Sequence, residues 1–473
     1  MVSVAAGLRV IAAAIATLGL PVAWPQSAVA DTLEGALIQA YQNNPQLNAQ
    51  RAATRALDEG VPQALSGYRP RVSVTASVGS QYTKTTLKTP SATAGGPIYT
   101  TTESTFTPHS VGLTATQTLF NGFQTANRTR QAESQVSGGR AALAVTEQTI
   151  LLNAATAYMN LLRDTAILDL QRRNVEVLQE QLRQTRDRFN VGEVTRTDVA
   201  QAESRLAAGR SQVLAAESNY VTSKAVYRQV IGVEPGRLSP GTPVDRLSPP
   251  TLAEAVSVGR ELNPSVGAAM FGIDAAALQV KINEGALAPQ LTATLSAQQA
   301  WETNVSTLLR QFNASLVTQL TVPVYQGGSE YSLVRQSKET LGQRRIDLDT
   351  ARDQVQQTVV QSWGQLEAAK AQIQATQAQV NAAEIALNGV REEARVGQRT
   401  TLDVLNAQQE LVNARVALVT AQRDRVVASY SLLSAVGRLQ VTVLGLNVPI
   451  YDPMGHYQQI RDSWVGLRNP DGR

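Results

Sequence analysis

An internal duplication limits the fold of this chain more than any other feature. Residues 32–45 recur as residues 251–264, with Thr-Leu at the start and Asn-Pro at the end of both stretches. Residues 191–206 recur as residues 396–411, with Val-Gly followed by Thr and Asp-Val in both. A chance alignment of helical segments does not give ordered matches at turns and prolines. Each structural element should therefore occur twice.

Residues 32 and 251, which start the first pair of matching stretches, are farther apart along the chain than residues 191 and 396, which start the second pair. The first half must therefore carry an insertion between Pro70 and Phe120. The insertion falls in residues 83–102, which are rich in Thr, Ser, Gly and Pro. This composition predicts a loop.

Long helices are expected to dominate each half. Proline is absent from residues 109–234 and from residues 324–448, which permits two uninterrupted helical hairpins. Apolar residues recur every seven positions in both stretches, as in a coiled coil: Leu161, Leu168, Val175, Leu182 and Phe189 in the first, and Leu366, Ile373, Val380, Leu387 and Ala394 in the second. Aromatic residues are only 5% of the chain, which fits long rods better than a bulky spherical core.

Each half should contain a helix of about 35 residues, two strands, one very long helix, a glycine-containing turn and a second helix. The first long helix would run from Gln124 to Phe189. At the helical rise per residue it would be about 100 Å long. Gly138-Gly139 is the weakest point of this helix.

Two segments, Val72–Val78 and Leu291–Ala297, alternate strictly between apolar and hydroxyl-bearing residues. They are predicted to be strands with one apolar face. Their expected partners, Val111–Phe120 and Ala314–Tyr325, alternate less cleanly. Aromatic residues lie near the strand ends, as in the girdle of a membrane barrel: Tyr68, Phe120, Phe123, Trp301 and Tyr325. A soluble hairpin that caps the rods is the alternative interpretation.

Four strands cannot close a barrel, because about eight are needed for a filled interior and open edges are not tolerated in lipid. Chains must therefore combine their strands. Three chains would supply twelve strands around a water-filled lumen, whereas two chains would supply a narrower eight. The expected fold is mostly helical with membrane β-structure: a homotrimeric twelve-strand barrel, four strands per chain, continued by a long helical barrel.

The N-terminus predicts export. Residues 1–30 carry one charge, Arg9, followed by an apolar run from Val10 to Leu20 and by Ala28-Val29-Ala30. This is typical of a signal peptide cleaved before Asp31, and a membrane anchor is the alternative. No later segment is expected to be apolar enough to cross a bilayer as a helix, which argues against an inner-membrane transporter.

The expected organisation has five parts. After the signal peptide (1–30) come a first repeat (31–232), an inter-repeat equatorial linker (233–250), a second repeat (251–437) and a C-terminal extension (438–473).

Composition also argues against several functions. The chain has no cysteine, only two histidines (His109 and His456) and a net charge of +4 without a basic run. We therefore expect no lipidation at an N-terminal cysteine, no metal, no cofactor, no nucleic-acid partner and no enzymatic activity.

Taken together, these motifs resemble the TolC family of outer-membrane efflux and secretion channels. The resemblance covers nearly the whole mature chain. It is carried by the duplicated helix starts described above, the strand-to-helix turns Leu119–Gly122 and Val324–Gly328, and the tip motifs Val191–Val199 and Val396–Val404. Each motif is weak alone, but their order, duplication and spacing are specific. The absence of cysteine places the chain closer to the non-lipidated branch of the family.

The tips have two interpretations. Thr195-x-x-Asp198 and Thr400-x-x-Asp403 both fit a capping box at a helix start, where the helix dipole favours an acidic residue. The resemblance implies, in addition, that the second tip narrows the periplasmic end through Arg399, Asp403 and Asn406. Family members often have a second aspartate where this chain has Asn406, which puts cation selectivity in doubt. The turns expected to contact an adaptor contain Val191, Gly192, Thr195, Asp198, Val396, Gly397 and Thr400.

The sequence thus predicts a non-enzymatic exit duct in the outer membrane, with its helical part in the periplasm, for efflux of drugs or type I secretion of proteins. The resemblance implies a homotrimer, a periplasmic adaptor (membrane fusion) protein and an inner-membrane transporter of the ABC or RND type. Energy must come from that partner, since no nucleotide-binding motif is present. A trimeric coiled-coil adhesin or a structural outer-membrane protein is the alternative. An adhesin would carry its strands once, at the C-terminus, whereas these strands occur twice and in mid-chain.

Overall fold

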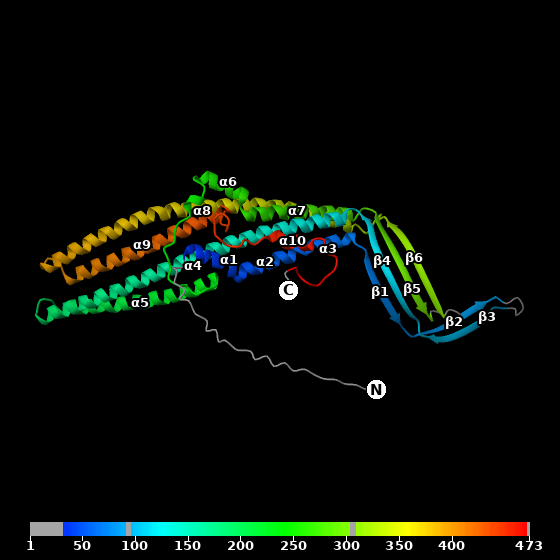
Figure 1. The fold of residues 1–473 in the computed structure, drawn as a ribbon, viewed down its shortest axis with the longest axis horizontal. Helices are drawn as coiled ribbons and strands as arrows, with labels where there is room; N and C mark the ends of the chain where they lie inside the picture. Colours follow the sequence, from blue (N-terminus) through cyan, green and yellow to red (C-terminus); the bar gives the residue numbers. More distant parts are fainter. Residues whose placement is uncertain (1–31, 91–95, 303–308, 471–473) are drawn as a thin grey trace, which may run out of the picture.

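The computed structural model describes residues 32–90, 96–302 and 309–470. The predicted signal peptide and its cleavage site lie outside this part. A long rod of helices carries a β-sheet at one end (Figure 1). The helices are α1 (Leu33–Asn43), α2 (Pro45–Asp58), α3 (Gly60–Leu65), α4 (Gln124–Asn190), α5 (Arg196–Ile231), α6 (Leu252–Leu262), α7 (Pro264–Gly285), α8 (Ser329–Arg395), α9 (Thr401–Ala435) and α10 (Pro453–Ile460). The strands are β1 (Arg71–Val78), β2 (Gln81–Thr89), β3 (Ile98–Phe106), β4 (His109–Asn121), β5 (Gln290–Trp301) and β6 (Arg310–Thr321).

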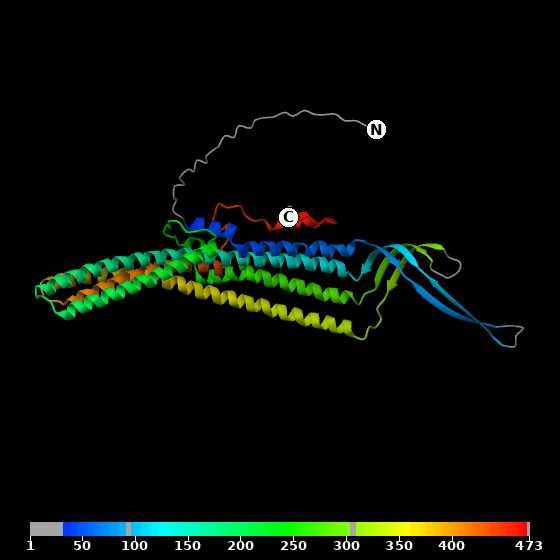
Figure 2. The same ribbon diagram turned by 90° about the horizontal axis from the view of Figure 1, so that it is seen from below.

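The duplication is visible in the helical hairpins. Helices α4 and α8 have 67 residues each, and they begin and end at corresponding positions of the two copies. Each is followed by a return helix, α5 with 36 residues and α9 with 35. The two hairpins lie side by side and end together at the pole opposite the sheet (Figures 1 and 2). The prediction of two long uninterrupted hairpins is confirmed.

Glycines 138 and 139 do not interrupt α4. They allow neighbouring helices to approach, because a Cβ on Gly139 would lie 2.6 Å from Leu57 Cδ1 of α2. A Cβ on Gly138 would meet Phe271 Cβ of α7 at 3.5 Å. Gly138 and Gly139 are therefore packing positions at which α4 meets α2 and α7.

The prediction of a single first helix in each half is wrong, because in both halves this helix is broken at an Asn-Pro pair. Asn44 Oδ1 accepts hydrogen bonds from the backbone N–H groups of Gln46 and Leu47 at 2.9 and 3.2 Å, so it ends α1 and caps α2. Asn263 does the same between α6 and α7, accepting from Ser265 N–H at 2.9 Å. Proline follows at the first helical position, where its missing N–H costs nothing.

These asparagines also hold the return helices. Asn44 Nδ2 donates to Val230 O near the end of α5, and Asn263 Nδ2 donates to Ala435 O at the end of α9, both at 2.9 Å. Both side chains are buried. One side chain in each half thus caps one helix and satisfies a carbonyl of another.

The main apolar core lies in the middle of the rod, where α1, α2, α4, α5 and α9 meet the C-terminal segment. Towards the tips, each hairpin is held by apolar residues, some of them at heptad positions. Leu178 and Leu182 pack on Leu206 in the first hairpin, and Val380 and Leu387 pack with Leu411 in the second. The last heptad residue, Phe189, is exposed.

Strands β1, β4, β5 and β6 form one antiparallel sheet in the order β1-β4-β5-β6. The register places one set of apolar side chains on a single face, with Val74 opposite Leu113, Leu113 opposite Ala297, and Ala297 opposite Ala314. Hydroxyl side chains share the other face, where Ser77 and Ser110 lie 2.9 Å apart and Ser296 and Ser315 lie 2.8 Å apart.

No core covers either face of this sheet within the described chain. All residues of β1 and β6 are exposed, including Val74 and Leu316 at 70% and 71%. An apolar face of this size is unfavourable in water, so the sheet requires a partner or a lipid environment.

Two strand predictions were wrong. The insertion at residues 83–102 is mostly a hairpin, in which β2 and β3 pair from Gln81–Phe106 to Thr89–Ile98. Its many threonines are β-branched and favour strands. Strand β6 covers Arg310–Thr321 rather than Ala314–Tyr325, because Pro323 has no N–H for a further ladder bond.

The strand-to-helix turns need left-handed backbone in both halves. Gly122 and Phe123 have φ of 64° and 61°, and Gly327 and Gly328 have φ of 75° and 84°. Gly122 cannot be replaced easily, because a Cβ there would lie 2.2 Å from Gly285 O. This contact packs the turn between β4 and α4 against the end of α7.

By length and composition, one described stretch could cross a membrane as a helix, namely Leu252–Gly285. The expectation that no later segment is apolar enough was therefore wrong. In the structure this stretch is broken at Asn263, and α7 packs along α4 and α8 within the rod.

The Asn263 joint gives a testable prediction. Asn263→Ala should lower the free energy of unfolding by about 1–3 kcal/mol, because it removes a cap and leaves the buried Ala435 carbonyl without a donor. Thermal unfolding followed by circular dichroism measures the effect. Asn381→Ala is the control, since Asn381 is exposed on α8 and outside the joint. Equal midpoints for the two variants would contradict the proposed role of the joint.

Candidate functional site at the hairpin tips

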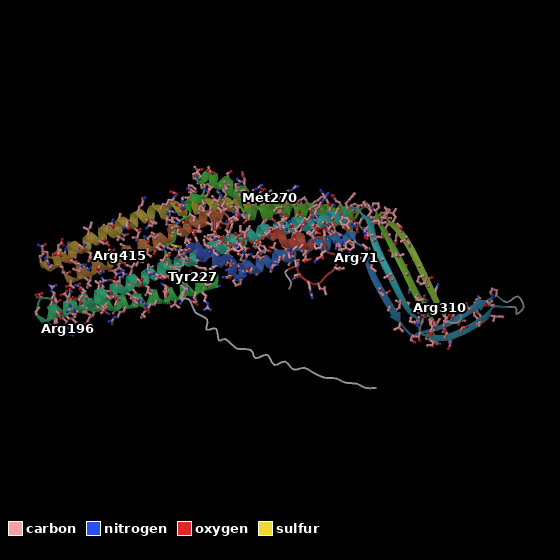
Figure 3. All side chains as sticks on the ribbon, viewed as in Figure 1. Arg71, Arg196, Tyr227, Met270, Arg310 and Arg415 are labelled. Atoms are coloured by element: carbon pink, nitrogen blue, oxygen red, sulfur yellow. The ribbon has the colours of Figure 1, made fainter. Side chains whose placement is uncertain are left out.

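The tips of the two hairpins lie together at the end of the rod farthest from the sheet. Figure 3 shows Arg196 at the start of α5 in the first tip. Both turns pass through a left-handed glycine, with φ of 79° at Gly192 and 82° at Gly397. Val191 and Val396 precede these glycines and are 72% and 67% exposed. Each tip therefore presents an exposed valine to the surroundings.

Both predicted capping boxes are formed. In the first tip, Asp198 N–H donates to Thr195 Oγ1 at 3.4 Å and Thr195 N–H donates to Asp198 Oδ2 at 2.9 Å. In the second, the equivalent distances between Asp403 and Thr400 are 3.2 and 3.0 Å. Capping thus accounts structurally for the threonine and aspartate of both halves.

The same hydrogen bonds stabilise the charged carboxylates. The hydroxyl and backbone N–H of Thr195 lower the pKa of Asp198. The backbone N–H and hydroxyl of Thr400 lower the pKa of Asp403, with a smaller contribution from the charge of Arg399. Both aspartates are therefore anionic at neutral pH.

Arg399 is paired within its own chain. Its Nε lies 2.9 Å from Glu393 Oε2, in the last turn of α8. This hydrogen bond raises the pKa of Arg399, and the charge of Asp403 adds to the effect. Both partners are about half exposed, so the pair contributes little to stability.

Asn406 connects the second tip to the first hairpin. Arg205 Nη2 on α5 donates to Asn406 Oδ1 on α9 at 2.7 Å. The neighbouring Leu405 is buried against Leu178 and Leu206 of the first hairpin. The structure thus brings Asn406 to α5, while Arg399 and Asp403 remain at the turn.

Sequence reasoning missed Arg205, Glu393 and Leu405. The pattern of one chain gives no signal for Arg205, because its contact with Asn406 joins residues 201 positions apart. Glu393 could have been found from the Glu-rich end of α8, just before Arg395. Leu405 could have been found as an apolar residue outside the heptad of its own hairpin.

A groove separates the two tips on the side of the long helices. It has a volume of about 650 Å³ and is open to solvent. The α4 wall carries Glu176, Glu180 and Arg188, and the α8 wall carries Arg391, Glu392 and Arg395. Both walls therefore carry charges of both signs.

Among residues 32–90, 96–302 and 309–470, no group of three His, Asp or Glu side chains could hold a metal ion. A surface of caps, exposed valines and ion pairs can bind a protein or shape an opening.

The fold and these tips define a class: an outer-membrane protein whose exposed apolar sheet is joined to a long helical rod. Comparison with known proteins identifies the family. The model of a family described as "Outer membrane efflux protein" matches residues 36–233 and 256–438. The chain belongs to this family, and the predicted resemblance to TolC-like channels is confirmed. It is an outer-membrane export channel protein of a transport family.

Two relatives and one solved structure illustrate the similarity. The outer membrane efflux protein BepC of Brucella suis is 42% identical over 95% of this chain and 94% of its own length. The outer membrane protein TolC of Escherichia coli is 28% identical over 65% of each chain. The CmeC outer membrane channel of Campylobacter jejuni has the same fold, with a TM-score of 0.72, 16% identity and coverage of 91% of this chain and 89% of that chain.

The capping boxes give a prediction about local stability. Asp403→Ala should speed hydrogen exchange of the amides in residues 401–406, because the first turn of α9 loses its cap. Asp403→Asn should have a smaller effect, since the amide oxygen can still accept from Thr400 N–H. Hydrogen exchange followed by mass spectrometry measures both.

The effect should depend on pH with a definite sign. The pKa of Asp403 is lowered in the folded state, so its stabilising effect is complete above the ordinary aspartate pKa. The effect is lost as pH falls through the lowered value. A difference between wild type and Asp403→Ala that persists unchanged in strong acid would show that the carboxylate is not the cap.

Proposed function

We propose that this chain assembles as a homotrimer whose three sheets close a twelve-strand barrel in the outer membrane. The observation that supports this proposal is the structure of the sheet. It has four strands, two open edges at β1 and β6, and an apolar face covered by nothing in the described chain. Lipid tolerates the apolar face but not the open edges, so neighbouring chains must supply the missing hydrogen bonds.

The hydroxyl face of the sheet supports a water-filled lumen. Ser, Thr, Asn and Gln side chains line it from Ser73 on β1 to Gln319 on β6. Apolar side chains outside and polar side chains inside are the pattern of a membrane barrel. The same closure would arrange three copies of each hairpin around one axis, which makes a helical barrel in the periplasm.

The second tip is proposed as the gate, formed by Arg399, Asp403 and Asn406. Three copies of Asp403 around the axis would concentrate negative potential at a narrow mouth. Opening would require the second hairpin to move away from the first. The resisting contacts are the Arg205–Asn406 hydrogen bond and the burial of Leu405.

The tip turns are proposed to contact a periplasmic adaptor. The exposed Val191 and Val396, set by Gly192 and Gly397, offer two apolar contacts at equal height. Thr195, Asp198 and Thr400 shape these turns through the capping boxes. The adaptor would connect the channel to an inner-membrane transporter of the ABC or RND type, which supplies the energy.

Efflux is the proposed cargo class, with type I protein secretion as the alternative. The name of the 42% identical relative, an efflux protein, supports efflux. A coiled-coil adhesin is disfavoured, because the sheet is built from two separate parts of the chain and the rod leads away from both.

The trimer has a direct test. The protein purified in detergent should have the mass of three chains, because each sheet edge is satisfied only by a neighbouring copy. Native mass spectrometry measures this. A stable folded monomer with channel activity would contradict the proposed assembly.

The gate can be tested by planar-bilayer recording. Arg399→Ala should raise conductance, because it removes the ion pair that holds the turn, while assembly should be unchanged. Arg395→Ala is the matched control: it removes an equally charged residue four positions away, paired with Glu392 at 3.3 Å. Equal conductance of the two variants would place the gate elsewhere.

Measuring ion selectivity distinguishes the role of Asp403 from that of Asn406. Asp403→Asn should lower cation preference while keeping most of the cap, and Asn406→Ala should change it less, because asparagine is uncharged. Unchanged selectivity in Asp403→Asn would leave this aspartate only its structural role.

A further inference from the structure

The C-terminal extension is folded along the rod, and it runs towards the sheet. Helix α10 packs on α2, and its Tyr457 packs against the cluster of Val61, Ala132 and Val136 and lies beside Arg140 of α4. His456 Nδ1 lies 3.2 Å from Oδ2 of the buried Asp58 at the end of α2. The chain beyond α10 continues towards the start of β1 and turns back there (Figure 1).

Arg69 fixes this segment at the junction of rod and sheet. Arg69 Nη1 donates to Ser463 O at 2.6 Å, and its guanidinium lies over the Trp464 ring, 4.6 Å from the centroid. Arg69 comes just before β1, whose first residue, Arg71, is labelled at this junction in Figure 3. Trp464 is therefore held at the level where the strands begin.

Apolar side chains at this position remain largely exposed within the described chain, although Arg69 lies over one side of the Trp464 ring. Trp464, Val465 and Leu467 are 68%, 91% and 104% exposed. At the same end of the sheet, Tyr68 and Tyr325 are 53% and 77% exposed. These aromatic residues continue the membrane boundary that the apolar face of the sheet defines, and tryptophan is enriched at such boundaries.

The charge of this region is suited to anionic headgroups. Arg69 and Arg468 form no ion pair within the described chain. Arg71 lies on the hydroxyl face of the sheet, opposite Thr116, and is not counted among them. Arg461 lies 4.0 Å from Glu133, and Asp462 is the acidic residue of the segment itself. Exposed apolar side chains beside unpaired arginines are typical of a segment that lies on a membrane surface.

We propose that residues 461–470 bind the periplasmic leaflet of the outer membrane. The side chains of Trp464, Val465 and Leu467 enter the headgroup region, and Arg69 and Arg468 bind anionic lipid headgroups. This contact attaches the rod to the membrane beside the barrel in a chain that has no cysteine for lipidation. The inference rests on the barrel placement proposed above.

Tryptophan fluorescence in lipid nanodiscs tests the proposal, because the chain has only four tryptophans: Trp24, Trp301, Trp363 and Trp464. Three variants of the full protein each keep one of the last three, with the others replaced by phenylalanine. Trp301 is on the apolar face at the far end of β5, and Trp363 is in the middle of α8. The quenchers are phospholipids brominated near the headgroup end or the tail end of the acyl chain, and aqueous iodide.

Trp464 should lose emission with bromine near the headgroup end, and should be protected from iodide. The loss should be greater when phosphatidylglycerol replaces part of the phosphatidylcholine. Trp301 should also be quenched by brominated lipid, and Trp363 should not. If Trp301 is not quenched, the barrel placement fails. If Trp301 is quenched and Trp464 is not, only the proposed membrane contact fails.

Protection of Trp464 from both quenchers would also overturn the proposal, because it would show that a neighbouring copy covers the segment. Arg69→Gln in the variant that keeps Trp464 should reduce lipid quenching, since the ring loses its support. Arg71→Gln is the matched control, because it removes a nearby charge and leaves that support. Lipid quenching that is equal in these two variants would contradict the role of Arg69.

Discussion

The whole architecture depends on the rule that backbone hydrogen bonds cannot remain open in lipid. A sheet of four strands has two edges, and its apolar face cannot remain in water either. These requirements are the basis of the proposal that several chains share one barrel in the membrane. In the proposed trimer, closing the barrel also fixes the three-fold arrangement of the hairpins and brings three copies of the second tip together. The membrane end of the molecule thereby determines the geometry of the opposite end.

Two joints transmit that geometry along the rod. At the sheet, the left-handed pair Gly122-Phe123 lies against Gly285 at the point where α4 leaves the sheet. In the middle, Asn44 and Asn263 each end one helix, begin another and hold a return helix by its last carbonyls. Both halves share the left-handed turn after the strand and the Asn-Pro joint, whereas the close approach to Gly285 occurs in the first half alone among the described glycines. The two hairpins reach the tips together (Figure 2).

The sequence was informative where structure is local, and less so elsewhere. Seven-residue spacing and proline-free stretches predicted α4, α5, α8 and α9, and two-residue alternation predicted β1 and β5. The capping boxes were predicted correctly because their partners are three positions apart. The hairpin β2–β3 was mistaken for a loop because turn-forming residues outweighed its threonines. The Arg205–Asn406 bond and the path of the C-terminal segment could not be predicted, because they join residues that only the folded chain brings together.

The equal length of α4 and α8 has a consequence for how such a chain can vary. Both helices have 67 residues, so their turns stand at the same height. Deleting one residue from either helix would lower its turn by about 1.5 Å and rotate it by about 100°. The exposed valine of that turn would then face a different direction from its counterpart, and Leu405 would miss the first hairpin. Length changes are therefore tolerated only in matched pairs of whole turns, whereas substitutions on the outer surface of the rod are free of this restriction.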